Sequence, residues 1–375
     1  MIYLDYSATT PVSYEVLESY NKATRDYIGN VNSIHSLGNE SRKLYNSATS
    51  QIANIFQIME SEIIYTSGAT EANNMALIGV AEQYKNRGNH IIVSKLEHPS
   101  IYNICDYLES IGFKISYVNN DEEGLIDFDD LRKKIKPETI LVSINAVNSE
   151  TGVRQPLKTI RQIVKKENQL TLLHSDMTQA VGKVVVNMHD VDLASFSAHK
   201  IYGPKGIGML YKASNVQMKP ILYGSSKTTS LRPGTPPLPL IVALSKAIRI
   251  SVMDLDKKEL YIKSLNDKIV DEFKTKYPNI IINKTKYSIP HILNVSVIGV
   301  KPESLVHALD KHEIYISTNT ACSNNELSTS VMAMTNDTKR ATSTIRISLS
   351  SLTSNEEINE FLKVFELEYN NLSKL

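Results

Sequence analysis

The sequence predicts an α/β fold with a large, mainly parallel sheet domain and a smaller α+β domain. Between about residues 60 and 212, short apolar runs alternate with longer amphipathic stretches, which is the pattern of a parallel sheet covered by helices on both faces. From about residue 255 the pattern changes to a charged helix followed by strand candidates. We therefore expect an N-terminal arm that packs with the small domain, then a large domain and a small domain, over residues 1–14, 15–254 and 255–375.

Short apolar runs are the strand candidates of the large domain, and helix-length segments separate several of them. The segment 71–87, for example, has helical length and is ended by Gly88. In open sheets of this kind, ligands bind at the carboxyl ends of the strands, so we expect the chemistry directly after these runs. The candidates are residues 62–67, 90–95, 114–119, 139–147, 170–176, 192–198 and 206–211.

The second half of the chain begins with a loop rich in Pro and hydroxyl residues at 227–240. We expect this loop to be ordered, because apolar helical sequence resumes directly after it. The strand candidates of the small domain are residues 293–299, 313–319 and 343–350.

Composition excludes several classes of function. Hydrophobic residues make up 42% of the chain and charged residues 22%, a balance that allows a sizeable core. The net charge is +1 and no basic block is interleaved with aromatics, so we expect no nucleic-acid partner. Neither a membrane span nor a secretory signal is indicated. Two cysteines, Cys105 and Cys322, are too few for a disulfide framework or a Cys-based metal site, and we expect a cytoplasmic protein without a metal.

Lys200 is the first candidate for chemistry, because it follows a predicted buried strand and precedes a Gly/Pro-rich turn. A lysine that leaves a strand into a cleft is unfavourable unless it is paired or chemically used. Desolvation in general lowers the pKa of an amine and favours the neutral form that adds to carbonyl groups. The alternative is a lysine in a surface loop.

Asp176 and Gln179 follow another strand whose residues are largely apolar. A buried carboxylate needs a cationic partner, and the protonated ring nitrogen of pyridoxal phosphate is one. Gln179 lies three residues further on and could donate a hydrogen bond to the phenolic oxygen of that cofactor. The alternatives are a helix-capping or ion-paired aspartate and a surface glutamine.

Two further strand ends carry candidate residues. Gly68 and Ala69 are small residues at a strand-to-helix junction before Thr70, where backbone amides form a site suited to phosphate. An ordinary helix capped by Thr70 explains the same pattern. His98, just past the next strand, could stack on a cofactor ring and move protons, or it could be a structural histidine.

Cys322 lies in a polar run with little periodicity, which predicts a loop. This setting is unlike that of the usual buried cysteine, which behaves as a small hydrophobe. A chance exposed thiol is the alternative. Cys105, in the helical run at 101–110, is predicted to be structural.

Segments from residue 3 to about residue 350 occur in a fixed order. They are YLDYSATTPV, TSGATEANN, SKLEH, NSETGV, HSDMTQAVGK, SFSAHKIYGPKGIG, LRPGT, LNVS, AC and IRISLS. Together they resemble the aspartate-aminotransferase-like (type I) pyridoxal-phosphate fold. More closely, they resemble the cysteine desulfurases of the NifS/IscS type, in the class V aminotransferase family.

The resemblance implies that Lys200 carries pyridoxal 5'-phosphate. It implies that Asp176 pairs with the ring nitrogen, that Gln179 contacts the phenolic oxygen and that His98 stacks on the ring. Thr235 would reach the phosphate from the neighbouring subunit of a homodimer. The remaining residues that would hold the phosphate are Ala69, Thr70, Ser197 and His199.

For the reaction, the resemblance implies that Arg346 binds the carboxylate of L-cysteine. Guanidinium geometry suits that task, although a structural salt bridge is the alternative. The counterpart of Cys322 takes the sulfur, which leaves alanine and a persulfide on the enzyme. An acceptor protein, an iron–sulfur scaffold or a tRNA thiolase, would then receive the sulfur.

The chain also departs from the family pattern. Asn148–Ser149 stands where the family has paired asparagines, and GSSKT at 224–228 replaces a Gly-rich loop. Both changes favour one alternative, a sulfur-carrier or scaffold protein that lost turnover. A selenocysteine lyase or class V aminotransferase is the other, and an aminotransferase would not need Cys322. A nicotinamide-binding protein is disfavoured because no GxGxxG follows an early strand.

Overall fold

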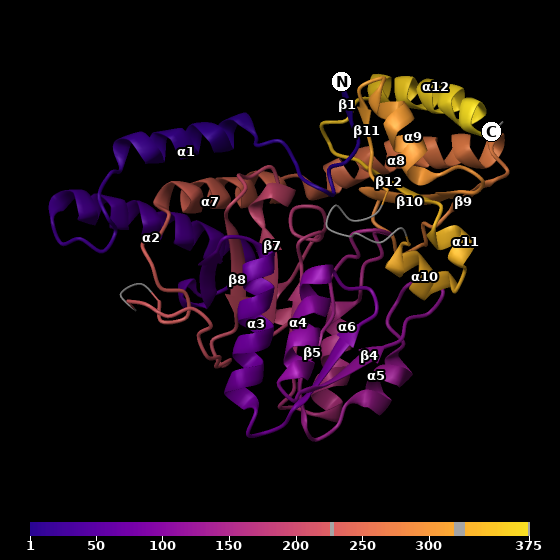
Figure 1. The fold of residues 1–375 in the computed structure, drawn as a ribbon. Coiled ribbons are helices and arrows are strands. Elements are labelled where there is room, and N and C mark those ends of the chain that lie inside the picture. Colours follow the sequence, from indigo (N-terminus) through magenta and orange to yellow (C-terminus); the bar gives the residue numbers. More distant parts are fainter. Residues whose placement is uncertain (226–228, 319–326, 374–375) are drawn as a thin grey trace.

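The structure is a computed structural model that describes residues 1–225, 229–318 and 327–373 (Figure 1). Its largest element is a seven-stranded sheet with the order β2-β8-β7-β6-β5-β3-β4. Neighbouring strands from β4 to β7 are parallel, and β8 is antiparallel to both β7 and β2. The predicted α/β class is confirmed, and every strand candidate of the large domain overlaps one strand. The strands are β2 (Ile63–Thr66), β3 (His90–Ser94), β4 (Lys114–Val118), β5 (Thr139–Ser143), β6 (Leu172–Asp176), β7 (Leu193–Ser197) and β8 (Gly208–Lys212).

Helices cover both faces of this sheet, as predicted. Successive side chains of a strand point to opposite faces, and β3 shows the result. Ile91 and Val93 pack in one buried cluster with α3 and α4, whereas Ile92 packs in another with α2, α6 and α7. The helices of this part are α1 (Tyr14–Asp26), α2 (Ser36–Phe56), α3 (Ala69–Tyr84), α4 (Pro99–Ser110), α5 (Phe128–Lys134), α6 (Leu157–Glu167) and α7 (Leu238–Val252).

A second, smaller sheet lies beyond the upper end of the large one in Figure 1 and has the antiparallel order β12-β10-β9. The strands are β9 (Ile280–Ile282), β10 (Ile292–Val297) and β12 (Thr344–Ser348). The helices around it are α8 (Leu255–Lys276), α9 (Pro302–Asp310), α10 (Thr329–Thr335), α11 (Thr338–Ala341) and α12 (Asn355–Leu372).

The N-terminal segment lies against this smaller part. β1 (Ile2–Tyr3) pairs in parallel with β11 (Ile314–Tyr315), and Leu4 is buried in one hydrophobic cluster with residues of α8 and α12. Within residues 313–318, the described part of the candidate strand at 313–319, the strand is thus confirmed over two residues. The division into residues 1–14, 15–254 and 255–375 stays our proposal, and the separate hydrophobic clusters support it.

Within the described part of the chain, no helix is both long and apolar enough to span a membrane. The same residues contain no group of three His, Cys, Asp or Glu side chains that could hold a metal ion. The cytoplasmic location and the lack of a metal remain predictions from the sequence.

Candidate active site

One cavity opens where β2, β3, β6 and β7 end, so most of the predicted site residues meet at the carboxyl ends of strands. All the predicted site residues except Thr235 and Cys322 line it. They are Ala69, Thr70, His98, Asp176, Gln179, Ser197, His199, Lys200 and Arg346.

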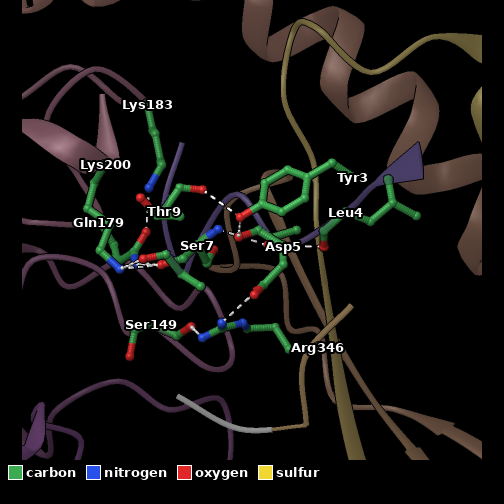
Figure 2. A network of polar contacts seen from close by, with 12 residues as sticks. Tyr3, Leu4, Asp5, Ser7, Thr9, Ser149, Gln179, Lys183, Lys200 and Arg346 are labelled. Atoms are coloured by element: carbon green, nitrogen blue, oxygen red, sulfur yellow. Dashed lines mark hydrogen bonds and ion pairs between the residues drawn. The ribbon is translucent and has the colours of Figure 1, made fainter. Parts of the chain in front are cut away.

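Lys200 ends η3 (Ala198–Lys200), a short 3-10 helix that directly follows β7. The turn after it needs Gly203, because a Cβ atom there would lie 2.8 Å from the Cβ of Ala198. The Lys200 Nζ donates to the backbone oxygens of Ser7 and Ala8, at 2.5 and 2.7 Å (Figure 2). The N-terminal segment therefore closes one side of the cavity and holds the lysine.

Asp176 is the last residue of β6 and is 7% exposed. Its Oδ1 accepts from the backbone N–H of Thr178, and its Oδ2 accepts from the Asn73 Nδ2, both at 2.9 Å. Neither partner is a cation. A carboxylate held in this way is placed to pair with a cationic group of a ligand.

Gln179 is held from two sides in the turn after β6. Its Nε2 donates to the backbone oxygen of Ser7 at 2.9 Å, and its Oε1 accepts from the Lys183 Nζ (Figure 2). Lys183 is buried, and burial first, then the charges of Lys200 and Arg346, lower its pKa well below the ordinary value. These contacts fix the orientation of the Gln179 amide.

The start of α3, the predicted anion site, lies beside the end of β7. Gly68 is the N-cap and gives no side-chain cap, while the backbone N–H of Ala69 donates to the Ser197 Oγ at 2.7 Å. The backbone at Gly68 lies close to the start of β8, since a Cβ atom on Gly208 would lie 2.6 Å from the Cα of Gly68. Helix N-termini attract anions through their exposed amides. Phosphate is therefore a suitable ligand at this position.

His199 lies beside this helix start, and its Nδ1 is 3.1 Å from the Thr9 Oγ1. Burial first, and then the neighbouring charges of Lys200 and Lys205, lower the pKa of His199 to about 4. The ring is therefore neutral near pH 7, which suits a hydrogen-bonding role.

His98 is the N-cap residue of α4, and its Nδ1 accepts from the backbone N–H of Ser100 at 3.1 Å. The same nitrogen lies 2.9 Å from the Ser100 Oγ. Burial lowers the pKa of His98, with the charge of Asp176 opposing the shift and that of Lys200 adding to it.

Arg346 on β12 reaches the cavity from the smaller sheet and is only 1% exposed. Its Nη2 donates to the Asp5 Oδ1, and its Nη1 donates to the backbone oxygen of Ser149, both at 3.0 Å (Figure 2). Burial raises the pKa of Asp5, and the guanidinium opposes that shift. The arginine is thus ion-paired and also lines the cavity.

Thr235 does not reach this cavity. It is exposed and lines a separate hollow with Asn30, Ser33 and Tyr223. Cys322 lies outside the described residues. Cys105 is buried in α4, as predicted for a structural cysteine, and burial raises the pKa of its thiol to about 12.

The cavity fits pyridoxal phosphate by the chemistry of its lining. Among the described residues, several buried polar atoms of lining side chains have no hydrogen-bond partner, which indicates a polar ligand. Two cations, Lys200 and Arg346, and the carboxylate of Asp176 match a ligand that joins a phosphate to a basic ring. The unpartnered atoms are Ser7 Oγ, Asn145 Oδ1, Thr178 Oγ1 and Arg346 Nε.

Five residues that hold the site were not predicted from the sequence. Ser7 and Ala8 line the cavity, whereas Asp5, Asn73 and Lys183 bond to residues that line it. Asp5 and Ser7 stand in the YLDYSATTPV segment, Asn73 in TSGATEANN and Lys183 in HSDMTQAVGK. Their presence in the matching segments was the available signal, but only the structure brings them to the cavity.

The fold and the site define a pyridoxal-phosphate enzyme, and the chain belongs to the aminotransferase class-V family. The sequence profile of that family matches residues 2–361. Members of this family depend on pyridoxal phosphate.

Within that family, the similar proteins include cysteine desulfurases. The cysteine desulfurase IscS of Dictyoglomus turgidum is 37% identical over 370 residues, which cover 97% of this chain and 93% of the relative. A solved NifS-like protein has a TM-score of 0.93 and 35% identity, with 100% of both chains covered. A solved complex of SspA with cysteine has a TM-score of 0.80 and 30% identity, and covers 94% of this chain and 100% of SspA.

Proposed function

We propose that this chain is a pyridoxal-phosphate-dependent cysteine desulfurase. It would convert L-cysteine to L-alanine and leave the sulfur as a persulfide on Cys322. The convergence of Lys200, Asp176 and Arg346 on one cavity carries the proposal, because the three supply an amine, a partner for a ring nitrogen and a carboxylate-binding group. The similarity to desulfurases over nearly the whole chain supports it.

Pyridoxal phosphate, when bound, supplies an electron sink for the carbon atoms next to the substrate amine. The residues of the chain would bind the cofactor and the substrate and orient them. Lys200 would hold the cofactor and move the proton of the substrate Cα. Asp176 would pair with the ring nitrogen, and the Gln179 Nε2 would donate to the phenolic oxygen. The start of α3 with Ser197 and His199 would hold the phosphate. Arg346 binds the substrate carboxylate while Asp5 fixes its guanidinium.

The sulfur step needs no outside oxidant. The thiolate of Cys322 attacks the sulfur of bound cysteine, so that a sulfur–sulfur bond forms as the carbon–sulfur bond breaks. The electron pair of the broken bond stays with the carbon, which gains a proton and leaves as alanine. We further propose that the persulfide sulfur passes to an acceptor protein that serves iron–sulfur assembly or tRNA thiolation.

We propose that the enzyme is a homodimer in which Thr235 completes the phosphate site of the partner. Thr235 is exposed and lines a hollow other than the cavity of its own chain. Its loop is fixed to α3 by an ion pair between Arg232 and Glu71, with 2.9 Å from Nε to Oε1. The large exposed side chains Ile34 and Tyr223 lie near the same hollow and suit a subunit interface.

The first test combines visible absorbance with product assays. Purified protein loaded with pyridoxal phosphate should absorb visible light, and Lys200→Ala should lose that band, while exposed Lys205→Ala keeps it. With L-cysteine and a reductant, alanine and sulfide should form in equal amounts. Cys322→Ser should abolish both, and Cys105→Ser should not.

Other outcomes point elsewhere. A coloured protein whose Cys322→Ser variant still turns over would favour a class V aminotransferase or selenocysteine lyase. A coloured protein without turnover would favour the carrier or scaffold alternative, which the changes at Ser149 and 224–228 suggest. A protein that never binds the cofactor would contradict the proposal.

A further inference from the structure

A buried amide, Asn73 on α3, connects Asp176 with the capping residue of α4. Asn73 is fully buried, and its Nδ2 is 2.9 Å from the Asp176 Oδ2 and 3.1 Å from the Ser100 Oγ. An ionised carboxylate only accepts hydrogen bonds. The nitrogen of the amide therefore faces Asp176, and its two hydrogens are used by Asp176 and Ser100.

The direction of the next hydrogen bond follows from the first. Because the Ser100 Oγ accepts from Asn73, its own hydrogen is available for the His98 Nδ1 at 2.9 Å. The backbone N–H of Ser100 points to the same ring nitrogen at 3.1 Å. A backbone N–H can only donate, so Nδ1 must be without a hydrogen. The hydrogen of the neutral His98 ring is then on Nε2.

A second proton on His98 would have to bind at Nδ1, where it would meet the N–H of Ser100 and end the cap of α4. The positive end of the α4 dipole also disfavours a charged ring at this position. Of the charged groups that face His98, Asp176 favours protonation and Lys200 opposes it. Neutral histidines held at helix N-termini act as hydrogen-bond donors in other enzymes.

We propose that Asn73 and Ser100 are positioning residues that fix His98 as a neutral ring with its hydrogen on Nε2. His98 then serves the cavity as a hydrogen-bond donor and stacking partner and takes up no proton, which leaves proton transfer to Lys200. The role of Lys200 rests on the proposed function, whereas the tautomer of His98 does not. Asn73 also couples the two sides of the cofactor site, since one amide holds both Asp176 and the His98 cap.

The test is a long-range ¹H–¹⁵N correlation spectrum of the holoenzyme labelled with [¹⁵N]histidine, with His98 assigned from His98→Gln. We expect the pattern of an Nε2–H neutral ring, unchanged from about pH 8 to about pH 6, where an ordinary histidine gains its proton. In Ser100→Ala and Asn73→Leu, the backbone N–H of residue 100 still faces Nδ1, so the ring should stay in the Nε2–H form. The hydroxyl hydrogen bond that opposes protonation of Nδ1 is lost or no longer fixed in direction, so the titration midpoint of His98 should rise by roughly half to one pH unit, the equivalent of one hydrogen bond.

Two control variants distinguish loss of these particular hydrogen bonds from a general disturbance of the fold. Ser100→Thr keeps the hydroxyl and should keep the wild-type pattern. Asn74→Ala removes the neighbouring amide, which donates to the Thr70 oxygen of its own helix. A hydrogen on Nδ1, or protonation of His98 within this pH range, would overturn the proposal. Variants that titrate like the wild type would overturn the roles of Asn73 and Ser100. Because the spectrum needs no turnover, its result is independent of whether alanine forms.

Discussion

Among the single residues, Arg346 is one whose environment the sequence predicted in part. An arginine inside an apolar strand predicts an anion nearby, and the structure places Asp5 at 3.0 Å. The sequence could not identify that partner, because 341 positions separate the two residues and nothing local relates them. Arg346 also lines the cavity, where a substrate carboxylate can bind.

We expect Arg346→Gln to lower kcat/KM for L-cysteine by about 10- to 100-fold, mostly through KM. Hydrogen bonds between charged groups contribute roughly 1.5–3 kcal/mol, and every 1.4 kcal/mol is about tenfold. Alanine formation at varied cysteine concentrations measures the effect. Arg340→Gln is the matched control, because Arg340 bonds to Asn283 in the smaller part of the chain. An unchanged KM in Arg346→Gln would leave the arginine a structural role only.

At the scale of elements, the strands and their carboxyl ends were predictable, because apolar runs and turn residues are local signals. The reversal of β8 was not, since an antiparallel strand has the same local pattern as its parallel neighbours. The hydrogen bonds between residues at different strand ends could not be predicted either. Glu97, after β3, accepts from the backbone N–H of Asn145, after β5, at 2.7 Å, and from the Ser94 Oγ at 2.5 Å.

Glu97 should make stability fall as pH rises. Burial, the largest cause, raises the pKa of Glu97 from 4.5 to about 8. Between these values the folded chain keeps a proton that the unfolded chain has lost, so this group's contribution decreases by on the order of 1 kcal/mol per pH unit.

Glu97→Gln keeps an acceptor for Asn145 and removes the titration. We therefore expect the free energy of unfolding, measured in urea at about pH 6 and about pH 8, to depend less on pH in Glu97→Gln than in the wild type. Glu109→Gln, on the exposed side of α4, should behave like the wild type. An identical pH dependence in all three proteins would show that Glu97 is ionised in the folded chain throughout.

At the scale of the whole molecule, the site residues came from segments spread over most of the sequence, and the predicted set largely meets in one cavity. That agreement was possible because the site residues of the large sheet lie at or after the ends of its strands, and parallel strands end at the same edge of a sheet. Arg346 is different, because it lies inside β12 of the smaller sheet. Asn73 and Lys183 could not be predicted, because their roles depend on side-chain contacts across elements. Thr235 has a role only if a second copy of the chain is present.

We expect the double variant Ile34→Asp with Tyr223→Asp to shift the protein from dimer to monomer in sedimentation experiments. Both side chains are strongly exposed, at 91% and 86%, and burying a carboxylate in an interface is unfavourable. The monomer should bind pyridoxal phosphate about tenfold or more weakly, because it lacks the hydrogen bond from Thr235 of the partner. Leu260→Asp, at an exposed position of α8, should stay dimeric. A wild-type monomer with full cofactor affinity would contradict the composite site.

Sulfur should leave L-cysteine and arrive on Cys322. Mass spectrometry of the Cys322 peptide, after mixing the holoenzyme with less than one equivalent of L-cysteine and no reductant, follows this transfer. We predict that the peptide gains the mass of one sulfur atom, that alanine forms in the same amount, and that the Cys105 peptide is unchanged. Alanine without added sulfur on Cys322, or added sulfur on Cys105 instead, would contradict the account.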